Sequence, residues 1–133
     1  GFGVSPNKAG IRPVMDASTI LDNDGKWIGS DDKRIYLTFD CGYENGFTPD
    51  ILNTLKEQGV QAAFFVTQTF IRDNVELTKQ MKEEGHLVCN HTVTHPSMPD
   101  LTVEEMKREI LECDAYMKEA TTRGIQSKNV AAL

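Results

Sequence analysis

Three short apolar runs recur along the middle of the chain, and each is followed by a segment with helical periodicity. The runs are Ile35 to Phe39, Gln61 to Thr67 and His86 to Asn90, and they contain many β-branched and aromatic residues with little alternation. Such runs are typical of strands that are covered on both faces, as in parallel sheets. They recur about every 25 to 27 residues, which indicates βαβ units with right-handed crossovers. The sequence therefore predicts an α/β fold in which three parallel strands alternate with helices.

Helix start signals stand after each predicted strand. Thr48-Pro49-Asp50 predicts a helix that begins with a hydroxyl cap and a proline in its first turn. Asp73-x-x-Glu76 and Thr102-x-x-Glu105 have the pattern of capping boxes. After the second box, residues spaced about 3.5 positions apart form an apolar stripe that we expect to face the core. This stripe consists of Val103, Met106, Ile110, Cys113 and Met117.

The first part of the chain lacks this alternation of apolar runs and helical segments. Asn23-Asp24-Gly25 predicts a tight turn, and Lys26-Trp27-Ile28 after it predicts a short extended piece. We therefore expect an irregular N-terminal arm over residues 1–33 and a folded domain over residues 34–133.

Composition and charge exclude several classes of protein. The chain has 133 residues, of which 39% are hydrophobic and 26% charged, as in one globular domain. No apolar run approaches the roughly 20 residues of a membrane span, and the chain carries no targeting signal. The net charge of −6 argues against nucleic acid as a partner, since phosphate backbones require clustered Lys and Arg. Three cysteines without a C-x-x-C pair suggest neither a disulfide framework nor a closed zinc site.

Residues that can carry chemistry follow the first and third predicted strands. Asp40 stands directly after the first strand, while His91 and His95 follow the third. The carboxyl ends of parallel strands meet at one edge, where loops form ligand sites. A helical turn would place both imidazoles on one face, where they would supply two of the three protein ligands of a catalytic zinc. The alternatives are that Asp40 only caps a turn and that the histidines are unrelated surface residues. Reactive side chains at the ends of two strands together favour a functional site.

Two motifs resemble those of a known family. Thr38-Phe39-Asp40-Cys41-Gly42 and His91-Thr92-Val93-Thr94-His95 are similar to the first two motifs of the polysaccharide deacetylases, the NodB-homology or carbohydrate esterase 4 enzymes. Gly42-Tyr43-Glu44-Asn45-Gly46 is similar to the branch with the sporulation deacetylases that make muramic-δ-lactam in peptidoglycan. The resemblance covers roughly Lys33 to Glu119. It implies the N-terminal part of a distorted (β/α)7 barrel and metal-dependent removal of N-acetyl groups from amino sugars.

The resemblance also implies a role for each site residue. His91 and His95 would bind a divalent metal ion, with zinc favoured, and Asp40 would be the general base. Asn90 or Thr92 would orient the imidazoles through their second ring nitrogens. The third histidine, His86, is expected to face away from this edge of the sheet.

The chain departs from the family pattern at two points. Many members have a second Asp where this chain has Cys41, so either a thiolate replaces that metal ligand, at about 2.3 Å from zinc, or the ligand has been lost. The later Arg-Pro and Leu-His motifs have no match before Leu133. We therefore expect residues 34–133 to be a partial deacetylase domain that ends before these motifs. A catalytically incomplete glycan-binding or metal-binding fragment is the alternative, and a purely structural interaction fragment is a third.

The implied partner is an N-acetylated glycan, with peptidoglycan favoured, at an extracytoplasmic or cell-wall location. A three-stranded piece of a barrel also leaves edge strands without a neighbour. Because such edges offer unpaired backbone groups, we expect self-association through them.

Overall fold

The computed structural model describes residues 11, 17–25, 29 and 32–122. The chain divides into two compact units, Gly1–Ile35 and Tyr36–Leu133. In the first unit, helix α1 (Ser18–Leu21) leads into a turn where Asp24 has a φ of 59° and the Gly25 amide donates to the Ile20 carbonyl at 2.8 Å. The turn predicted at Asn23-Asp24-Gly25 is therefore confirmed. The extended piece predicted after it, at residues 26–28, lies outside the described residues.

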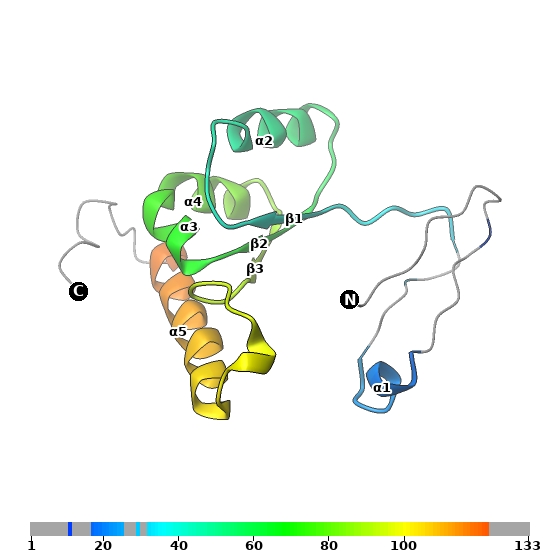
Figure 1. Cartoon of the computed structure of the whole chain (residues 1–133). Coiled ribbons are helices and arrows are strands. Elements are labelled where there is room, and N and C mark those ends of the chain that lie inside the picture. Colours follow the sequence, from blue (N-terminus) through cyan, green and yellow to red (C-terminus); the bar gives the residue numbers. More distant parts are fainter. Residues whose placement is uncertain (1–10, 12–16, 26–28, 30–31, 123–133) are drawn as a thin grey trace. The chain divides into compact units, whose positions relative to one another are not determined.

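The second unit is built on a parallel sheet of three strands in the order β1-β2-β3 (Figure 1). The strands are β1 (Thr38–Cys41), β2 (Ala63–Val66) and β3 (Leu87–Asn90). Helix α2 (Thr48–Glu57) connects the first two strands, and α3 (Gln68–Asp73) and α4 (Val75–Glu83) connect the second and third. The short helix η1 (Met98–Asp100) and the long α5 (Val103–Thr122) follow β3. Three parallel strands thus alternate with helices, as predicted.

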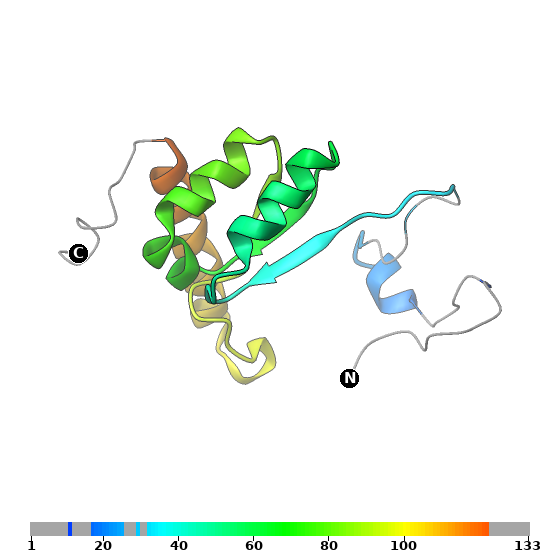
Figure 2. The same cartoon turned by 90° about the horizontal axis from the view of Figure 1, so that it is seen from above.

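One face of the sheet is covered by helices, and we call the other one the open face. Phe64 and Val66 of β2 are fully buried on the covered face, where Phe39 stacks on Phe64 with ring centroids 4.9 Å apart. Helices α2 and α4 lie side by side there (Figure 2). All the helices of this unit except η1 contribute to one core, with Leu52, Leu55, Phe70, Ile71, Met81, Cys113 and Ala120.

The first strand differs from its prediction. Ile35 and Tyr36 were expected in a strand covered on both faces, but β1 begins at Thr38, and their side chains are 88% and 67% exposed. In the described part of the chain β1 pairs only with β2, so it is an edge strand, and only its Phe39 and Cys41 side packs against the core. Asp40 therefore lies within the strand and not after it.

Helix α2 begins differently from its prediction. Its N-cap is Phe47, and the carboxylate of Glu44 accepts a hydrogen bond of 3.2 Å from the Thr48 amide, so the predicted hydroxyl cap is wrong. Burial alone would raise the pKa of Glu44, but hydrogen bonds from Thr48 lower it overall. The acidic side chain upstream thus replaces the hydroxyl as acceptor at this helix end.

One of the two predicted capping boxes forms. The Thr102 amide donates to the Glu105 carboxylate at 2.8 Å, and the Glu105 amide donates to the Thr102 hydroxyl at 3.3 Å. The other prediction is wrong, because Asp73 ends α3 and its carboxylate pairs with the guanidinium of Arg72 at 2.8 Å. Helix α4 then begins after Asn74 without a side-chain cap.

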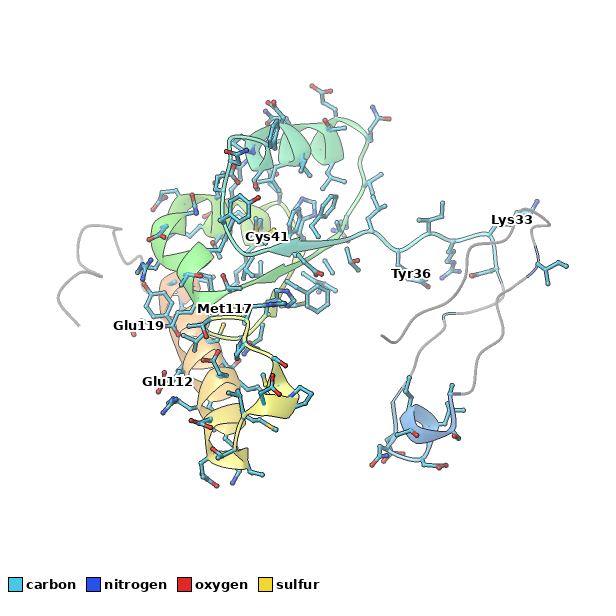
Figure 3. All side chains as sticks on the ribbon, viewed as in Figure 1. Lys33, Tyr36, Cys41, Glu112, Met117 and Glu119 are labelled. Carbon is cyan, nitrogen blue, oxygen red and sulfur yellow. The ribbon has the colours of Figure 1, made fainter. Side chains whose placement is uncertain are left out.

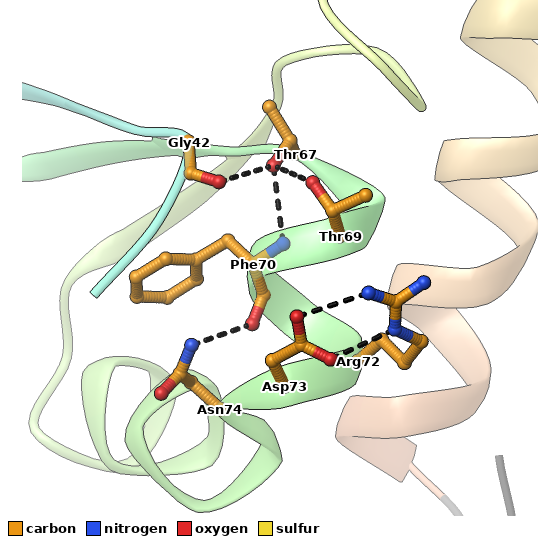
Figure 4. A network of polar contacts seen from close by, with 7 residues as sticks. All are labelled: Gly42, Thr67, Thr69, Phe70, Arg72, Asp73 and Asn74. Atoms are coloured by element: carbon orange, nitrogen blue, oxygen red, sulfur yellow. Dashed lines mark hydrogen bonds and ion pairs between the residues drawn. The ribbon is translucent and has the colours of Figure 1, made fainter. Parts of the chain in front are cut away.

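A hydroxyl network joins the ends of β1 and β2 (Figure 4). Thr67 is the N-cap of α3, and its Oγ1 accepts a hydrogen bond of 3.1 Å from the Phe70 amide. The same oxygen lies 2.8 Å from the Thr69 hydroxyl and donates to the Gly42 carbonyl at 3.4 Å. This contact ties the loop after β1 to the turn after β2 at the carboxyl edge of the sheet.

The buried face of α5 is rotated from the predicted stripe. Val103 and Ile110 are 63% and 48% exposed, whereas Cys113 is fully buried and the acidic Glu109 is only 9% exposed. The apolar stripe is therefore only partly correct. None of the helices in the described part of the chain is long and apolar enough to cross a membrane.

Candidate active site

Asp40 lies on the open face of the sheet. Along β1 the side chains alternate, so that Phe39 and Cys41 pack toward the helices while Thr38 and Asp40 point the other way and are exposed. In the register of the sheet, Asp40 is the direct neighbour of Phe65 on β2. The carboxylate is therefore solvated and stands next to an aromatic ring.

His91 reaches the same face from the third strand. It follows β3 directly, and its imidazole lies edge-on to the Phe65 ring, with centroids 6.2 Å apart and an angle of 63°. Phe65 is paired with Asp40 on one side and with Cys89 on the other. Two strand spacings put the backbones of Asp40 and Cys89 roughly 10 Å apart. Asp40 and His91 thus flank Phe65 on the open face.

The two imidazoles after β3 lie together. The ring centroids of His91 and His95 are 4.5 Å apart, with an angle of 53° between the ring planes. The expected helical turn between them is absent, because Thr92 and His95 have left-handed φ values of 71° and 57°. Such a conformation costs of order 1–3 kcal/mol per residue and persists only where the surroundings fix it. The loop must therefore be held from outside.

Hydrogen bonds to the loop amides supply that restraint. Each of the five consecutive backbone amides of residues 91–95 has an acceptor, and only the first of these acceptors is a backbone carbonyl. The pairs are His91 to the Val66 carbonyl at 3.1 Å, Thr92 to Asn90 Oδ1 at 2.8 Å, Val93 and Thr94 to Glu109 Oε2 at 2.9 Å each, and His95 to Thr92 Oγ1 at 2.9 Å. The oxygens of Asn90 and Thr92 therefore hold the loop backbone, in place of the ring contacts that we expected.

Glu109 is a residue of the site that the sequence motifs did not indicate. It lies three positions after Met106 and four before Cys113, a spacing that also fits the buried side of the helix. An acidic residue on the buried side of a helix is a signal in the sequence, because a buried carboxylate requires hydrogen-bond partners.

Cys41 lies apart from the imidazole pair. Its side chain packs against the core beside Phe39, whose carbonyl accepts a weak 3.9 Å contact from the thiol (Figure 3 labels Cys41 on β1). Burial, helped by the negative charges of Asp40 and Glu44, raises the pKa of the Cys41 thiol to about 11. Because only the thiolate is a good ligand, this environment does not favour metal binding by Cys41.

Two imidazoles therefore remain as candidate ligands for a metal ion. Among the described residues, no group of three or more His, Cys, Asp or Glu side chains is placed to hold an ion. The imidazoles of His91 and His95 are nevertheless of the chemical type that divalent ions such as zinc prefer, and their ring centroids lie only 4.5 Å apart. In this respect the residues present fit such an ion.

His86 lies away from this site. It precedes β3 at the amino edge of the sheet and is buried beside Phe64, with ring centroids 5.3 Å apart. Its Nδ1 accepts a hydrogen bond of 3.2 Å from the Ala62 amide. The expectation that His86 faces away from the carboxyl edge is therefore confirmed.

Comparison with protein families gives a match over most of the chain. The sequence profile of polysaccharide deacetylases matches residues 28–128. The peptidoglycan-N-acetylmuramic acid deacetylase PdaA of Bacillus subtilis strain 168 is 43% identical over 94 residues, which are 70% of this chain and 36% of that protein. A chitooligosaccharide deacetylase of Rhizobium leguminosarum bv. trifolii is 46% identical over 84 residues, or 63% of this chain and 39% of that protein. The chain thus spans well under half the length of these two relatives.

Solved structures confirm the predicted fold. A family 4 carbohydrate esterase from Bacillus anthracis superposes with a TM-score of 0.78 at 37% identity, covering 91% of this chain and 59% of that one. Bacillus subtilis PdaA, also a family 4 carbohydrate esterase, gives a TM-score of 0.83 at 33% identity, covering 94% and 54%. The three strands and their helices therefore correspond to part of the (β/α) barrel of these proteins.

Proposed function

Because the chain belongs to the polysaccharide deacetylase family, we propose that it carries part of the active site of a metal-dependent hydrolase that removes N-acetyl groups from an amino-sugar polysaccharide. Peptidoglycan is the favoured substrate, since PdaA is named for its action on peptidoglycan. One observation carries the proposal. Asp40 and the paired imidazoles of His91 and His95 flank Phe65 on one face of the sheet.

Each residue has a defined role in this proposal. His91 and His95 would hold a divalent ion, with zinc favoured, and when bound such an ion would acidify water and polarise the acetamide carbonyl. Asp40 is the general base, because its solvated carboxylate can accept the proton that the attacking water loses. The water oxygen bonds to the acetyl carbon, the carbon–nitrogen bond breaks, and acetate leaves while the sugar amine takes up a proton. Cys41 has no part in this set, since its thiol packs on the covered face.

The experiment is a measurement of acetate released from N-acetylated peptidoglycan in the presence of Zn²⁺. Release that stops on addition of a chelator and in Asp40→Asn supports the proposal. Unchanged release by His91→Ala contradicts the assigned chemistry. The exposed Glu112→Gln on α5 serves as a control that should behave like the unmodified chain.

A second candidate is a glycan-binding or metal-binding part without turnover. It is favoured by the small number of metal ligands, because the described part of the chain brings together two imidazoles and no group of three ligands. Acid catalysis alone is typically worth about 10² to 10⁴ in rate, so a site without a group that protonates the leaving amine would bind the glycan but turn it over weakly. Affinity for the glycan without acetate release would identify this case.

An extracytoplasmic location and self-association extend the proposal. The location follows from the favoured peptidoglycan substrate.

Among the described residues, β1 and β3 each pair only with β2, so both present an unpaired edge. Light scattering tests the association, and a folded monomer at high concentration would rule it out.

A further inference from the structure

A buried carboxylate supports the loop that carries the imidazole pair. Glu109 lies in the first half of α5 and is only 9% exposed. Burying a carboxylate is costly unless hydrogen bonds replace its water. Oε2 of Glu109 accepts from the amides of Val93 and Thr94 at 2.9 Å each, and Oε1 accepts from the Thr94 hydroxyl at 3.0 Å. All the donors are residues between the two histidines.

These bonds select the shape of the loop. In a helical turn, the amide of His95 would bond to the carbonyl of His91. Instead, Glu109 takes the two amides before it, and the Thr92 hydroxyl takes the amide of His95 itself. Thr92 is β-branched and has a φ of 71°, a conformation that such residues rarely adopt without support. The carboxylate therefore fixes a backbone that the loop sequence does not favour.

The support itself is firmly anchored. On α5, Cys113 and Ala120 are buried in the core. Nδ2 of Asn90, the last residue of β3, donates to the Ile110 carbonyl at 2.8 Å, next to Glu109 in the chain. The start of the loop and the carboxylate that holds its middle are thus joined to the same helix.

We propose that Glu109 is a positioning residue that holds the loop between His91 and His95 in its metal-binding shape before an ion arrives. The inference rests on the proposed function, which makes these two histidines the metal ligands. Glu109 contacts the loop through the amides of Val93 and Thr94 and through the Thr94 hydroxyl, and not through either imidazole. Groups that hydrogen-bond the ligands themselves typically matter 10- to 100-fold for affinity, and we expect an effect of the same order from a group that fixes the loop between two ligands.

The test compares Glu109→Gln with Glu112→Gln in the 133-residue chain. Gln keeps the size of the side chain but replaces one acceptor oxygen with a donor. Glu112 is exposed on the same helix (Figure 3) and controls for the loss of a charge. Zn²⁺ affinity is measured by competition with a chromophoric chelator, and thermal unfolding is followed without metal.

We expect Glu109→Gln to lose about 10- to 100-fold in Zn²⁺ affinity, while Glu112→Gln keeps the affinity of the unmodified chain. A variant that is less stable but binds Zn²⁺ equally well overturns the inference. If Glu109→Gln does not fold, Glu109→Asp keeps the charge with a shorter reach. A Zn²⁺ affinity of Glu109→Asp equal to that of the unmodified chain would likewise overturn the inference.

A readout without metal separates this inference from the proposed function. In the metal-free chain, hydrogen exchange at the amides of Val93 and Thr94 should be slow, and it should become faster in Glu109→Gln. Fast exchange in the unmodified chain overturns the inference alone. Slow exchange together with no Zn²⁺ binding overturns the proposed function, and with it the role of Glu109 in metal binding.

Discussion

The hydroxyl of Thr92 accepts a hydrogen bond of 2.9 Å from the backbone amide of His95, and both residues have positive φ. The bond closes the turn that brings the rings of His91 and His95 to 4.5 Å. The Thr92 hydroxyl is thus the acceptor for the amide of His95, and the Glu109 carboxylate is the acceptor for the two amides before it. We therefore expect the pairing of the imidazoles to depend on both acceptors.

Replacing Thr92 tests the closure of this turn. Thr92→Val keeps the shape but leaves the His95 amide without its acceptor, so we expect a loss of about 1 kcal/mol in the free energy of unfolding and weaker Zn²⁺ binding. Thr92→Ser keeps the hydroxyl and should retain both properties. Urea unfolding and metal titration measure the effects. Equal behaviour of the Val variant and the unmodified chain would contradict this description of the loop.

Local signals in the sequence predicted the fold well. The periodicity of the apolar runs predicted three parallel strands with helices between them, and Thr102 and Glu105 form the predicted capping box. Asp73 follows the same pattern but pairs with its neighbour Arg72, a competing partner that the pattern ignores. At this position the predicted capping box is therefore replaced by a local ion pair.

The shape of the site depended on contacts between distant residues. The histidine loop is not helical because Glu109, 15 positions after Thr94, accepts its amides. Likewise, Ile35 and Tyr36 lie before β1, which begins only at Thr38, and both residues are exposed. Patterns along the sequence carry neither piece of information. They predicted that Asp40 and the imidazoles lie at one edge of the sheet, but not how the loop is built.

The Cys41 thiol should react only at alkaline pH. Its pKa of about 11 means that the thiolate is the minor form below that pH, at about one molecule in a thousand at pH 8. Because the thiolate is the nucleophile, alkylation by iodoacetamide should rise about tenfold per pH unit until about pH 11. Peptide mapping by mass spectrometry measures the rate at this position. A rate that levels off below pH 9 would show that the thiol is less buried than described.

Removing the same thiol should leave metal binding intact. Cys41 packs against the core on the covered face, whereas the imidazoles lie beside Phe65 on the open face. We therefore expect Cys41→Ser to bind Zn²⁺ with unchanged affinity. A tenfold weaker affinity, with normal thermal unfolding, would instead make Cys41 the third ligand.

The network around Thr67 should stabilise the carboxyl edge of the sheet. Thr67→Val removes the cap of α3 and the contact with the Gly42 carbonyl, so the free energy of unfolding should fall by about 1–2 kcal/mol. Thr67→Ser keeps the oxygen and should lose much less. Denaturant unfolding of both variants gives the comparison. A valine variant as stable as the serine variant would show that the hydroxyl contributes nothing.

An anomalous scattering map at the zinc edge, from crystals of the zinc-loaded chain, tests the central claim most directly. We expect one strong peak at bonding distance from the imidazoles of both His91 and His95. It should lie on the open face beside Phe65, on the side of Asp40. A peak at another place, or no peak at these two rings in crystals that contain zinc, would contradict the assignment of the site.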